Sequence, residues 1–180
     1  MSWTIAGKLA VERAVDRLDL LGEPVVKALD AIPDRDQIGV APIDPDLADT
    51  AAFCAEYGSP LDASANCVVV AGKRSGEERF AACLVLATTR ADVNGIVRRR
   101  LDVRKASFAP MDTAVELTGM AYGGITPIGL PDSWPLLIDA RVAGLPELVI
   151  GSGIRASKLL IPGPVLAALP NAEIIEGLGQ

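Results

Sequence analysis

The chain has 180 residues, of which 50% are hydrophobic and 22% charged, and this favours one globular domain over a disordered segment. The net charge of -6 argues against strong nonspecific attraction to nucleic acid or anionic membranes. No apolar run reaches the roughly 18 residues of a membrane span, and charges interrupt the first segment where a signal peptide needs its apolar core, so a cytoplasmic protein with no membrane partner is expected.

The sequence has no histidine and only three cysteines, Cys54, Cys67 and Cys83. These cysteines are too widely spaced for a zinc site, so neither a metal nor a cofactor is expected. Cys67 and Cys83 lie in apolar runs typical of buried thiols, although a thiol-dependent enzyme using Cys54 or Cys67 stays open. Without histidine, Ser-His-Asp and Cys-His catalysis are excluded, and chemistry must use backbone dipoles, other side chains or groups of the substrate.

The N-terminal half alternates helix and hairpin signals. Apolar residues at helical spacing predict a helix over roughly the first 30 residues, up to interruptions at Gly22 and Pro24. A second helix is expected over "LADTAAFCAEY", after an aspartate cap and before Gly58. "NCVVVAG" and "RFAACLVLA" flank the polar turn "KRSGEE" and predict a β-hairpin.

The C-terminal half mixes short helices with short strands. Thr88 and Thr89 are the expected caps of a third helix through "ADVNGIVRRRLD", and "PMDTAVELTG" predicts a fourth, with Pro110 in its first turn and Gly119 past its end. "PLLIDA", "ELVIGSG" and "SKLLIP" predict three strands, followed by a last helix in "PVLAALP". Strands interspersed with helices, without regular βαβ alternation, indicate an α+β domain around a mixed sheet.

Two glycine motifs and a basic run are weaker signals. "VIGSGIRAS" contains G-x-G-x-x-A, but no helix pattern follows it, so a tight turn between strands is favoured over a dinucleotide site. "AGKRSG" is better explained as part of the hairpin than as a phosphate loop. The run Arg98, Arg99 and Arg100 predicts either a solvated helix face or a row of phosphate contacts.

The segment "MAYGGITPIGLP", Met120 to Pro131, has three glycines and two prolines, which indicates a loop with a particular backbone path. Together with the preceding "ELTGMAY", the following "LLIDA" and the later "VIGSG", it resembles the YbaK/EbsC family, free-standing relatives of the editing domain of bacterial prolyl-tRNA synthetases. The resemblance covers 39–180 and implies a single domain with a mixed, partly barrel-like sheet flanked by helices. Residues 1–38 are then expected to form a helical extension packed on that domain.

The resemblance implies a trans-acting deacylase that hydrolyses the ester between a wrong amino acid and its tRNA, such as alanine or cysteine on tRNA for proline. Gly123, Gly124, Thr126 and Pro127 match the loop that holds the aminoacyl group. Glycine lets the backbone approach a ligand and proline stiffens the loop, so fixed dipoles can stabilise an oxyanion. The base can then come from the substrate, for instance a ribose hydroxyl. The expected partner is the aminoacyl-tRNA acceptor end, bound weakly, while a synthetase partner and a homo-oligomer stay open.

Asp139 in "LLIDA" matches the family's strand aspartate, which lies near the pocket. A catalytic role is therefore one interpretation, and a structural carboxylate that accepts backbone hydrogen bonds is the other. Gly151, Ser152 and Gly153 match the turn on the other side of the family's pocket and are expected to bind substrate.

The sequence departs from the family at Asn66, where many members carry a lysine that is thought to hold the tRNA end. Asparagine supplies a hydrogen bond but no charge. Either another cation substitutes, with Lys73, Lys105 and Lys158 as candidates, or deacylation is weak. Another alternative is a noncatalytic module that binds a tRNA end, an amino acid or a partner protein. The expected tRNA contacts are Lys73, Arg98, Arg99, Lys105 and Lys158.

Overall fold

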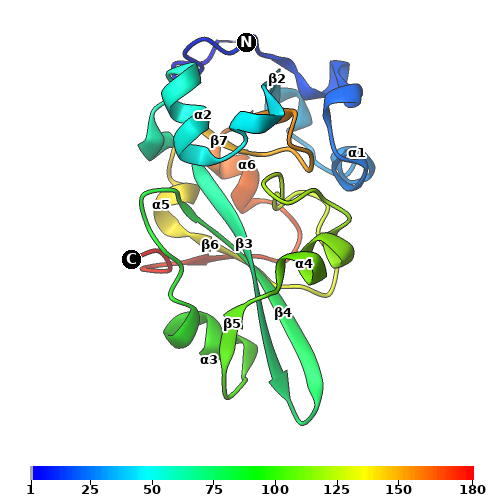
Figure 1. Ribbon diagram of the computed structural model, residues 1–180, viewed down its shortest axis with the longest axis vertical. Helices are drawn as coiled ribbons and strands as arrows, with labels where there is room; N and C mark the ends of the chain where they lie inside the picture. The colour runs from blue at the N-terminus through cyan, green and yellow to red at the C-terminus, as the bar shows by residue number, and fades with distance from the viewer. Residues whose placement is uncertain (1) are drawn as a thin grey trace.

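Two β-sheets carry the fold in this computed structural model, which describes residues 2–180 (Figure 1). The strands are β1 (Glu12–Arg13), β2 (Gly39–Pro42), β3 (Ala65–Arg74), β4 (Glu77–Leu86), β5 (Ala106–Phe108), β6 (Leu136–Asp139), β7 (Leu148–Gly151), β8 (Ser157–Ile161) and β9 (Ala172–Ile175). One sheet has the antiparallel order β1-β2-β8-β7. The other has the order β5-β3-β4-β6-β9 and is mixed, because β4, β6 and β9 pair in parallel.

Short helices cover the sheets and connect their strands. The α-helices are α1 (Glu23–Leu29), α2 (Thr50–Tyr57), α3 (Arg98–Leu101), α4 (Met111–Thr118), α5 (Ala140–Ala143) and α6 (Gly163–Ala167). A π-helical turn, Val93–Val97, leads into α3, and 3-10 turns occupy Ala14–Asp16, Leu18–Leu20, Arg35–Gln37, Pro45–Leu47 and Leu61–Ala63. Within residues 2–180, no helix has the length and apolar character that crossing a bilayer requires.

Both sheets are buried on two faces. Side chains from both sheets meet in the main core, which also takes residues of α1, α4, α5 and α6. The π turn and α3 cover the outer face of the β3-β4 sheet, and α2 with the N-terminal segment covers the outer face of the β2-β8 sheet. Burial on both faces explains why strands such as β4 and β8 are continuous apolar runs rather than alternating ones.

The α+β fold class is confirmed, with the strands divided between two sheets. The β3-β4 hairpin, the three strands β6, β7 and β8, and the helices α2, α4 and α6 all lie where the sequence predicts them. Gly58 and Gly119 end α2 and α4 with φ angles of 73° and 68°, a left-handed conformation that glycine adopts without strain. Pro110 is the N-cap of α4 rather than part of its first turn. The sequence did not predict β2, β5 or β9, which have only four, three and four residues.

The prediction of a helix before Gly22 is wrong. That segment contains β1 and two 3-10 turns, and the helix α1 begins at Glu23, with Gly22 as its N-cap. The apolar residues serve two separate cores, since Leu9 packs in the outer cluster under α2 while Ala14 and Leu21 pack in the main core. A single helical stripe would bury all of them on one side. The division between 1–38 and 39–180 stays a prediction, although β1 pairs with β2 across it.

The third predicted helix has a different cap and a different form. Asp92, not Thr88 or Thr89, caps it, because its carboxylate accepts hydrogen bonds from the backbone N–H groups of Gly95 and Ile96. Thr89 instead donates its hydroxyl to a carbonyl oxygen of the preceding strand. Aspartate and threonine are both good caps, so the choice depends on where the chain leaves β4.

Candidate functional site

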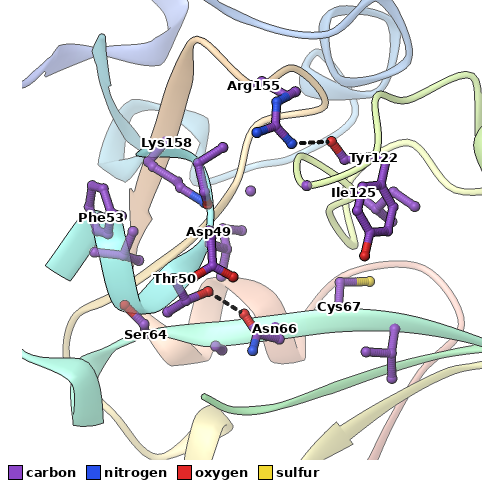
Figure 2. Close-up of a pocket in the computed structure, with 17 residues that line it drawn as sticks. Asp49, Thr50, Phe53, Ser64, Asn66, Cys67, Tyr122, Ile125, Arg155 and Lys158 are labelled. Carbon is purple, nitrogen blue, oxygen red and sulfur yellow. Dashed lines mark hydrogen bonds between the residues drawn. The ribbon is translucent and has the colours of Figure 1, made fainter. Parts of the chain in front are cut away.

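A pocket of about 290 Å³ opens beside the start of β3 (Figure 2). Four parts of the chain form it: the start of α2, the start of β3, the glycine-rich loop after α4, and the β7-β8 hairpin. The lining residues are Ala48, Asp49, Thr50, Phe53, Ser64, Ala65, Asn66, Cys67, Val68, Tyr122, Gly123, Ile125, Val149, Ile150, Gly151, Arg155 and Lys158. The pocket therefore lies where the two sheets approach each other.

The free edge of β3 gives the pocket one wall. On the side away from β4, β3 pairs with β5 only at Val70–Gly72, and Ser64 forms an isolated bridge with Val149 of the other sheet. Between these pairings, residues 66–68 have no strand neighbour on that side within the described chain. Alternate residues of a strand direct their backbone groups to opposite neighbours, and Val69 O accepts from Ala109 N on this side, so Cys67 is the residue whose N–H and C=O are available to a ligand here.

Asn66 occupies this wall and is held by α2. The hydroxyl of Thr50 donates to Asn66 Oδ1 at 2.9 Å, and both residues line the pocket. This contact uses the amide oxygen, and none of residues 2–180 accepts a hydrogen bond from the Asn66 NH₂ group. Asn66 thus presents neutral donors, and no charge, at the start of β3.

Close glycine contacts fix the opposite wall, formed by the loop after α4. The N–H of Gly153 donates to Gly124 O at 2.7 Å, and a Cβ on Gly124 would lie 2.5 Å from Ile154 O. A Cβ on Gly151 would lie 2.7 Å from the carbonyl oxygens of Gly124 and Ile125. The loop therefore packs backbone to backbone on the β7-β8 turn, which only glycine permits at these positions.

Three loop amides on this wall have no hydrogen-bond partner among residues 2–180. Gly124 N already donates to Ala121 O at 2.9 Å, and Thr126 N lies 3.4 Å from the sulfur of Met120. Tyr122, Gly123 and Ile125 all line the pocket, and their N–H groups make no hydrogen bond within the described residues. These three amides are the candidate donors that this loop can offer to a bound oxygen.

Arg155 connects the loop to the segment before α2. Its guanidinium donates to Tyr122 O and to Pro45 O, each at 3.0 Å. Gly123 has a φ of 85°, and a Cβ there would lie 2.4 Å from Arg155 Nη1. The backbone angle therefore favours glycine at 123, and a Cβ there would also displace the guanidinium from its hydrogen bond to Tyr122 O.

Lys158 reaches the inner end of the pocket from β8. Its side chain is buried, with a relative exposure of 7%, and Nζ donates to Ala48 O at 2.9 Å. The same Nζ lies 5.4 Å from the centroid of the Phe53 ring, a cation–π geometry. Burial lowers the pKa of Lys158, and the Arg155 charge lowers it further, while Cys54 and Asp49 act in the opposite direction.

Two of the three cysteines, Cys67 and Cys83, are poorly suited to act as nucleophiles. Cys67 lines the pocket, but burial, together with Cys83 beside it, raises the pKa of its thiol well above the ordinary value. Burial also raises the pKa of Cys83 to about 12. Since the thiolate is the reactive form, both thiols stay protonated near neutral pH. Within residues 2–180, no group of three or more Cys, Asp or Glu side chains is placed to hold a metal ion.

The structure brings four of the sequence-predicted residues to the pocket: Asn66, Gly123, Gly151 and Lys158. The others lie outside its lining. Gly124 and Gly153 lie behind the lining, where the loop and the β7-β8 turn pack backbone to backbone. Thr126 and Ser152 are fully buried. Pro127 lines a separate cavity of about 190 Å³. Lys73 and Lys105 line a surface depression near the far end of β3, and Arg98 and Arg99 lie on α3.

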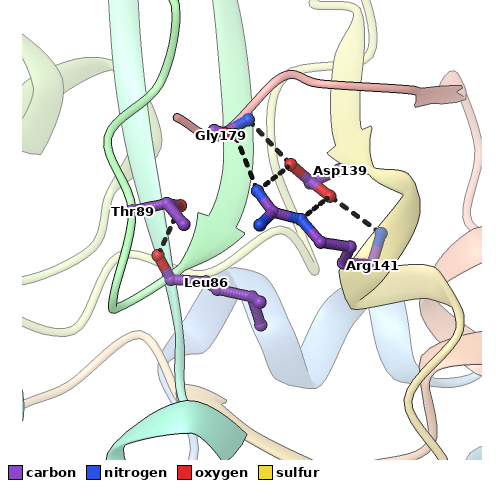
Figure 3. Close-up of polar contacts among 5 residues, drawn as sticks. All are labelled: Leu86, Thr89, Asp139, Arg141 and Gly179. Atoms are coloured by element: carbon purple, nitrogen blue, oxygen red, sulfur yellow. Dashed lines mark hydrogen bonds and ion pairs between the residues drawn. The ribbon is translucent and has the colours of Figure 1, made fainter.

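Asp139 is also outside the pocket lining, at the end of β6 (Figure 3). Its carboxylate accepts hydrogen bonds from Arg141 N at 2.8 Å and Gly179 N at 2.7 Å, and from the Arg141 guanidinium at 3.2 Å. Burial alone would raise the pKa of Asp139, but the hydrogen bonds from Arg141 and Gly179 outweigh it and lower the pKa. This geometry favours the structural carboxylate over the catalytic one.

Several lining residues were not singled out from the sequence: Thr50, Phe53, Ser64, Tyr122, Ile125 and Arg155. They come from segments far apart in the chain, and the pattern of each segment is explained by local structure alone. One signal was available, because Lys158 is a charged residue inside the apolar run "SKLLI" of a buried strand. A charge at such a position needs a partner or a ligand.

Comparisons with known proteins agree with this architecture. The model of the aminoacyl-tRNA editing domain family matches residues 44–169. Among solved structures, a candidate trans-editing enzyme for prolyl tRNA synthetase is similar at a TM-score of 0.73 and 21% identity, covering 88% of this chain and 96% of that one. A protein described as hypothetical is similar at a TM-score of 0.75 and 18% identity, covering 88% and 100%. A scaffold protein for grafted epitopes is similar at a TM-score of 0.73 and 20% identity, covering 88% and 97%.

Proposed function

The chain belongs to the aminoacyl-tRNA editing domain family, and on that premise we propose that it hydrolyses the ester of mischarged aminoacyl-tRNA in trans, in the cytoplasm. The pocket beside β3 supports the proposal, because it joins an open cavity to a tightly packed loop with three N–H groups that make no hydrogen bond within residues 2–180, among them those of Gly123 and Ile125. The similar trans-editing protein is described as acting for prolyl tRNA synthetase, which supports the same reaction class here.

In this proposal the ester lies against the loop wall. Water adds to the carbonyl carbon, and the oxyanion that forms accepts hydrogen bonds from the N–H groups of Gly123 and Ile125. Its collapse breaks the bond to the ribose oxygen and releases the amino acid. A neighbouring ribose hydroxyl of the terminal adenosine takes the proton from the water and returns it to the leaving oxygen. No histidine, thiol or metal takes part in these proposed steps.

The test is a panel of tRNAs charged with different amino acids, including alanine and cysteine on tRNA for proline. Loss of each ester is followed with and without the purified chain, and spontaneous hydrolysis is subtracted. We expect faster hydrolysis of at least one ester in the presence of the chain. If no ester is hydrolysed faster than spontaneously, the neutral Asn66 wall is better explained by a noncatalytic module that binds a tRNA end, an amino acid or a partner protein.

The basic residues outside the pocket are expected to contact the body of the tRNA. Lys73 lies seven positions further along β3 than Asn66, a distance of about 23 Å at the rise of a strand. A cation that far from the pocket reaches the backbone of the RNA rather than its last nucleotide. Lys73, Lys105, Arg98 and Arg99 are therefore proposed to position the acceptor stem through its phosphates.

We expect tRNA affinity to be modest and to fall as salt rises, because phosphate contacts release counterions. The double substitution Lys73→Ala and Lys105→Ala should reduce the slope of log affinity against log salt by about 2. Lys27→Ala, at an exposed position paired with Glu23, is the control and should leave the slope unchanged. The affinity for tRNA is measured by filter binding between low and physiological salt concentrations. An affinity that does not change with salt would contradict these phosphate contacts.

A further inference from the structure

The inner end of the pocket holds a buried ammonium group whose hydrogen bonds are incomplete. Lys158 has a relative exposure of 7%, and its Nζ makes one hydrogen bond, to Ala48 O at 2.9 Å. Among residues 2–180, no carboxylate lies within 4.0 Å of this nitrogen. An ammonium has three N–H donors, so the two others face the pocket or its solvent.

The charged groups around this nitrogen do not neutralise it. Arg155 adds a second positive charge to the pocket, while Asp49 is the one carboxylate among the lining residues. Asp49 is exposed at the mouth and makes no ion pair with Lys158. Cys54 is the remaining titratable neighbour, and its thiol contacts Ser64 Oγ at 3.7 Å. The inner end of the pocket is therefore electropositive, and Ala48 O is the one oxygen among residues 2–180 that accepts a hydrogen bond from Lys158 Nζ.

The pocket has an exposed end and a buried end, and this determines which part of an aminoacyl-tRNA enters it first. Tyr122, with a relative exposure of 56%, and Gly123 are exposed and mark the mouth, whereas Phe53 is buried and its ring lies beside Lys158 (Figure 2). The bulk of a tRNA stays outside, so the acyl group at its tip enters first. The α-ammonium of that acyl group is repelled by Lys158 and attracted by Asp49, which turns the acyl side chain inward.

We propose that Lys158 makes the inner end of the pocket a subsite for acyl side chains that carry an oxygen acceptor, above all the carboxylate of an aspartyl or glutamyl group. This assignment rests on the proposed function. An apolar acyl group would displace water from the ammonium without replacing its hydrogen bonds, and an unsatisfied buried donor of this kind costs about 10- to 100-fold. A carboxylate would supply both the acceptor and the missing charge.

The experiment compares aspartyl, asparaginyl and alanyl esters of one RNA minihelix, so that only the acyl group changes. For the wild-type chain, kcat/KM should be about 10-fold or more higher for the aspartyl than for the alanyl ester. Lys158→Met should lower kcat/KM for the aspartyl ester and raise the alanyl value, because the apolar acyl group no longer desolvates an ammonium. Lys158→Arg keeps the charge and should retain much of the preference. Lys27→Met, an exposed lysine on α1, should keep the wild-type ratio.

An equal loss for all three esters in Lys158→Met would overturn the subsite, because Lys158 would then act on the ester itself. Thermal melts control for folding, and Lys158→Met should melt no lower than wild type since it removes a buried charge. Calorimetry with nonhydrolysable aspartylamido- and alanylamido-adenosine measures binding without hydrolysis. It therefore tests the Lys158 subsite separately from the proposed deacylase activity. If no ester is hydrolysed, the proposed function fails. Preferential binding of the aspartyl analogue would still support the subsite, and equal binding would overturn it.

Discussion

Replacing Gly124 with alanine is expected to reduce deacylation by about 100-fold, the loss that a displacement of about 1 Å can cause in a positioned site. Gly124 does not line the pocket, so the added methyl group does not fill it. Its Cβ would lie 2.5 Å from Ile154 O and 2.7 Å from Ile154 C, and these are backbone atoms of the β7-β8 turn that cannot rotate away. The loop or the turn must move instead.

The consequence of that movement follows from the contacts between the two segments. Gly153 N donates to Gly124 O at 2.7 Å, and Ala121 N donates to Gly153 O at 3.0 Å. Moving the loop away weakens both hydrogen bonds and displaces the amides of Gly123 and Ile125 from the oxyanion that they are proposed to bind. The added strain should also lower the free energy of unfolding by about 1–3 kcal/mol, as in other overpacked sites.

Single-turnover rates on a mischarged tRNA, measured well below the melting temperature of the variant, test this prediction. Gly144→Ala is the matched control, because a Cβ there lies no closer than 3.4 Å to any atom outside its chain neighbours, at the end of α5. It should leave the rate unchanged. A fully active Gly124→Ala variant that remains folded would show that the loop wall takes no part in the reaction.

The fold could be predicted from the sequence to the extent that each element has a local signal. The β3-β4 hairpin has two long apolar strands and a turn at Ser75 and Gly76, whose φ angles are 52° and 80°. The glycines that end α2 and α4 can likewise be predicted from the local sequence. The N-terminal segment was mispredicted because its apolar spacing fits a helix, whereas its residues pack into two cores on opposite sides of a sheet. Nothing in the local pattern distinguishes these cases.

The site was only partly predictable for the same reason. Gly123 and Gly151 are visible in the sequence because a tight backbone approach requires glycine. The partners of a side chain are different, since they depend on which distant segments meet. Lys158, Lys73 and Lys105 were equal candidates to replace the charge missing at Asn66, and only the tertiary structure separates them. Lys158 reaches the pocket from β8, while the other two lie near the far end of β3.

Replacing Asp139 with alanine is expected to lower the free energy of unfolding by about 1–3 kcal/mol, as when buried hydrogen-bond donors lose their acceptor. The Asp139 carboxylate is fully buried and joins the start of α5 to the C-terminal residues through Arg141 N and Gly179 N (Figure 3). Arg141 also donates to Gly179 O at 2.6 Å. Without the carboxylate, these donors lose their acceptor and the end of the chain loses its attachment to β6.

The stability that the Asp139 carboxylate contributes should decrease as the pH falls. Hydrogen bonds from Arg141 and Gly179 outweigh burial and lower the pKa of Asp139 below its ordinary value of 3.8. A group whose pKa is lowered by folding contributes stability above its unfolded pKa and loses that contribution as the pH falls through the folded pKa. The difference in stability between wild type and Asp139→Ala should therefore be complete near neutral pH and shrink below about pH 3.8.

A measurement of deacylation distinguishes a structural role of the Asp139 carboxylate from a catalytic one. Chemical denaturation gives the stability of Asp139→Ala, and deacylation is then measured at a temperature where the variant is still folded. Because Asp139 is not among the pocket-lining residues, the folded variant should keep most of its activity. Glu23→Ala, which removes an exposed carboxylate paired with Lys27, should change stability by less than about 1 kcal/mol. A folded Asp139→Ala variant that is inactive would instead assign the carboxylate to catalysis.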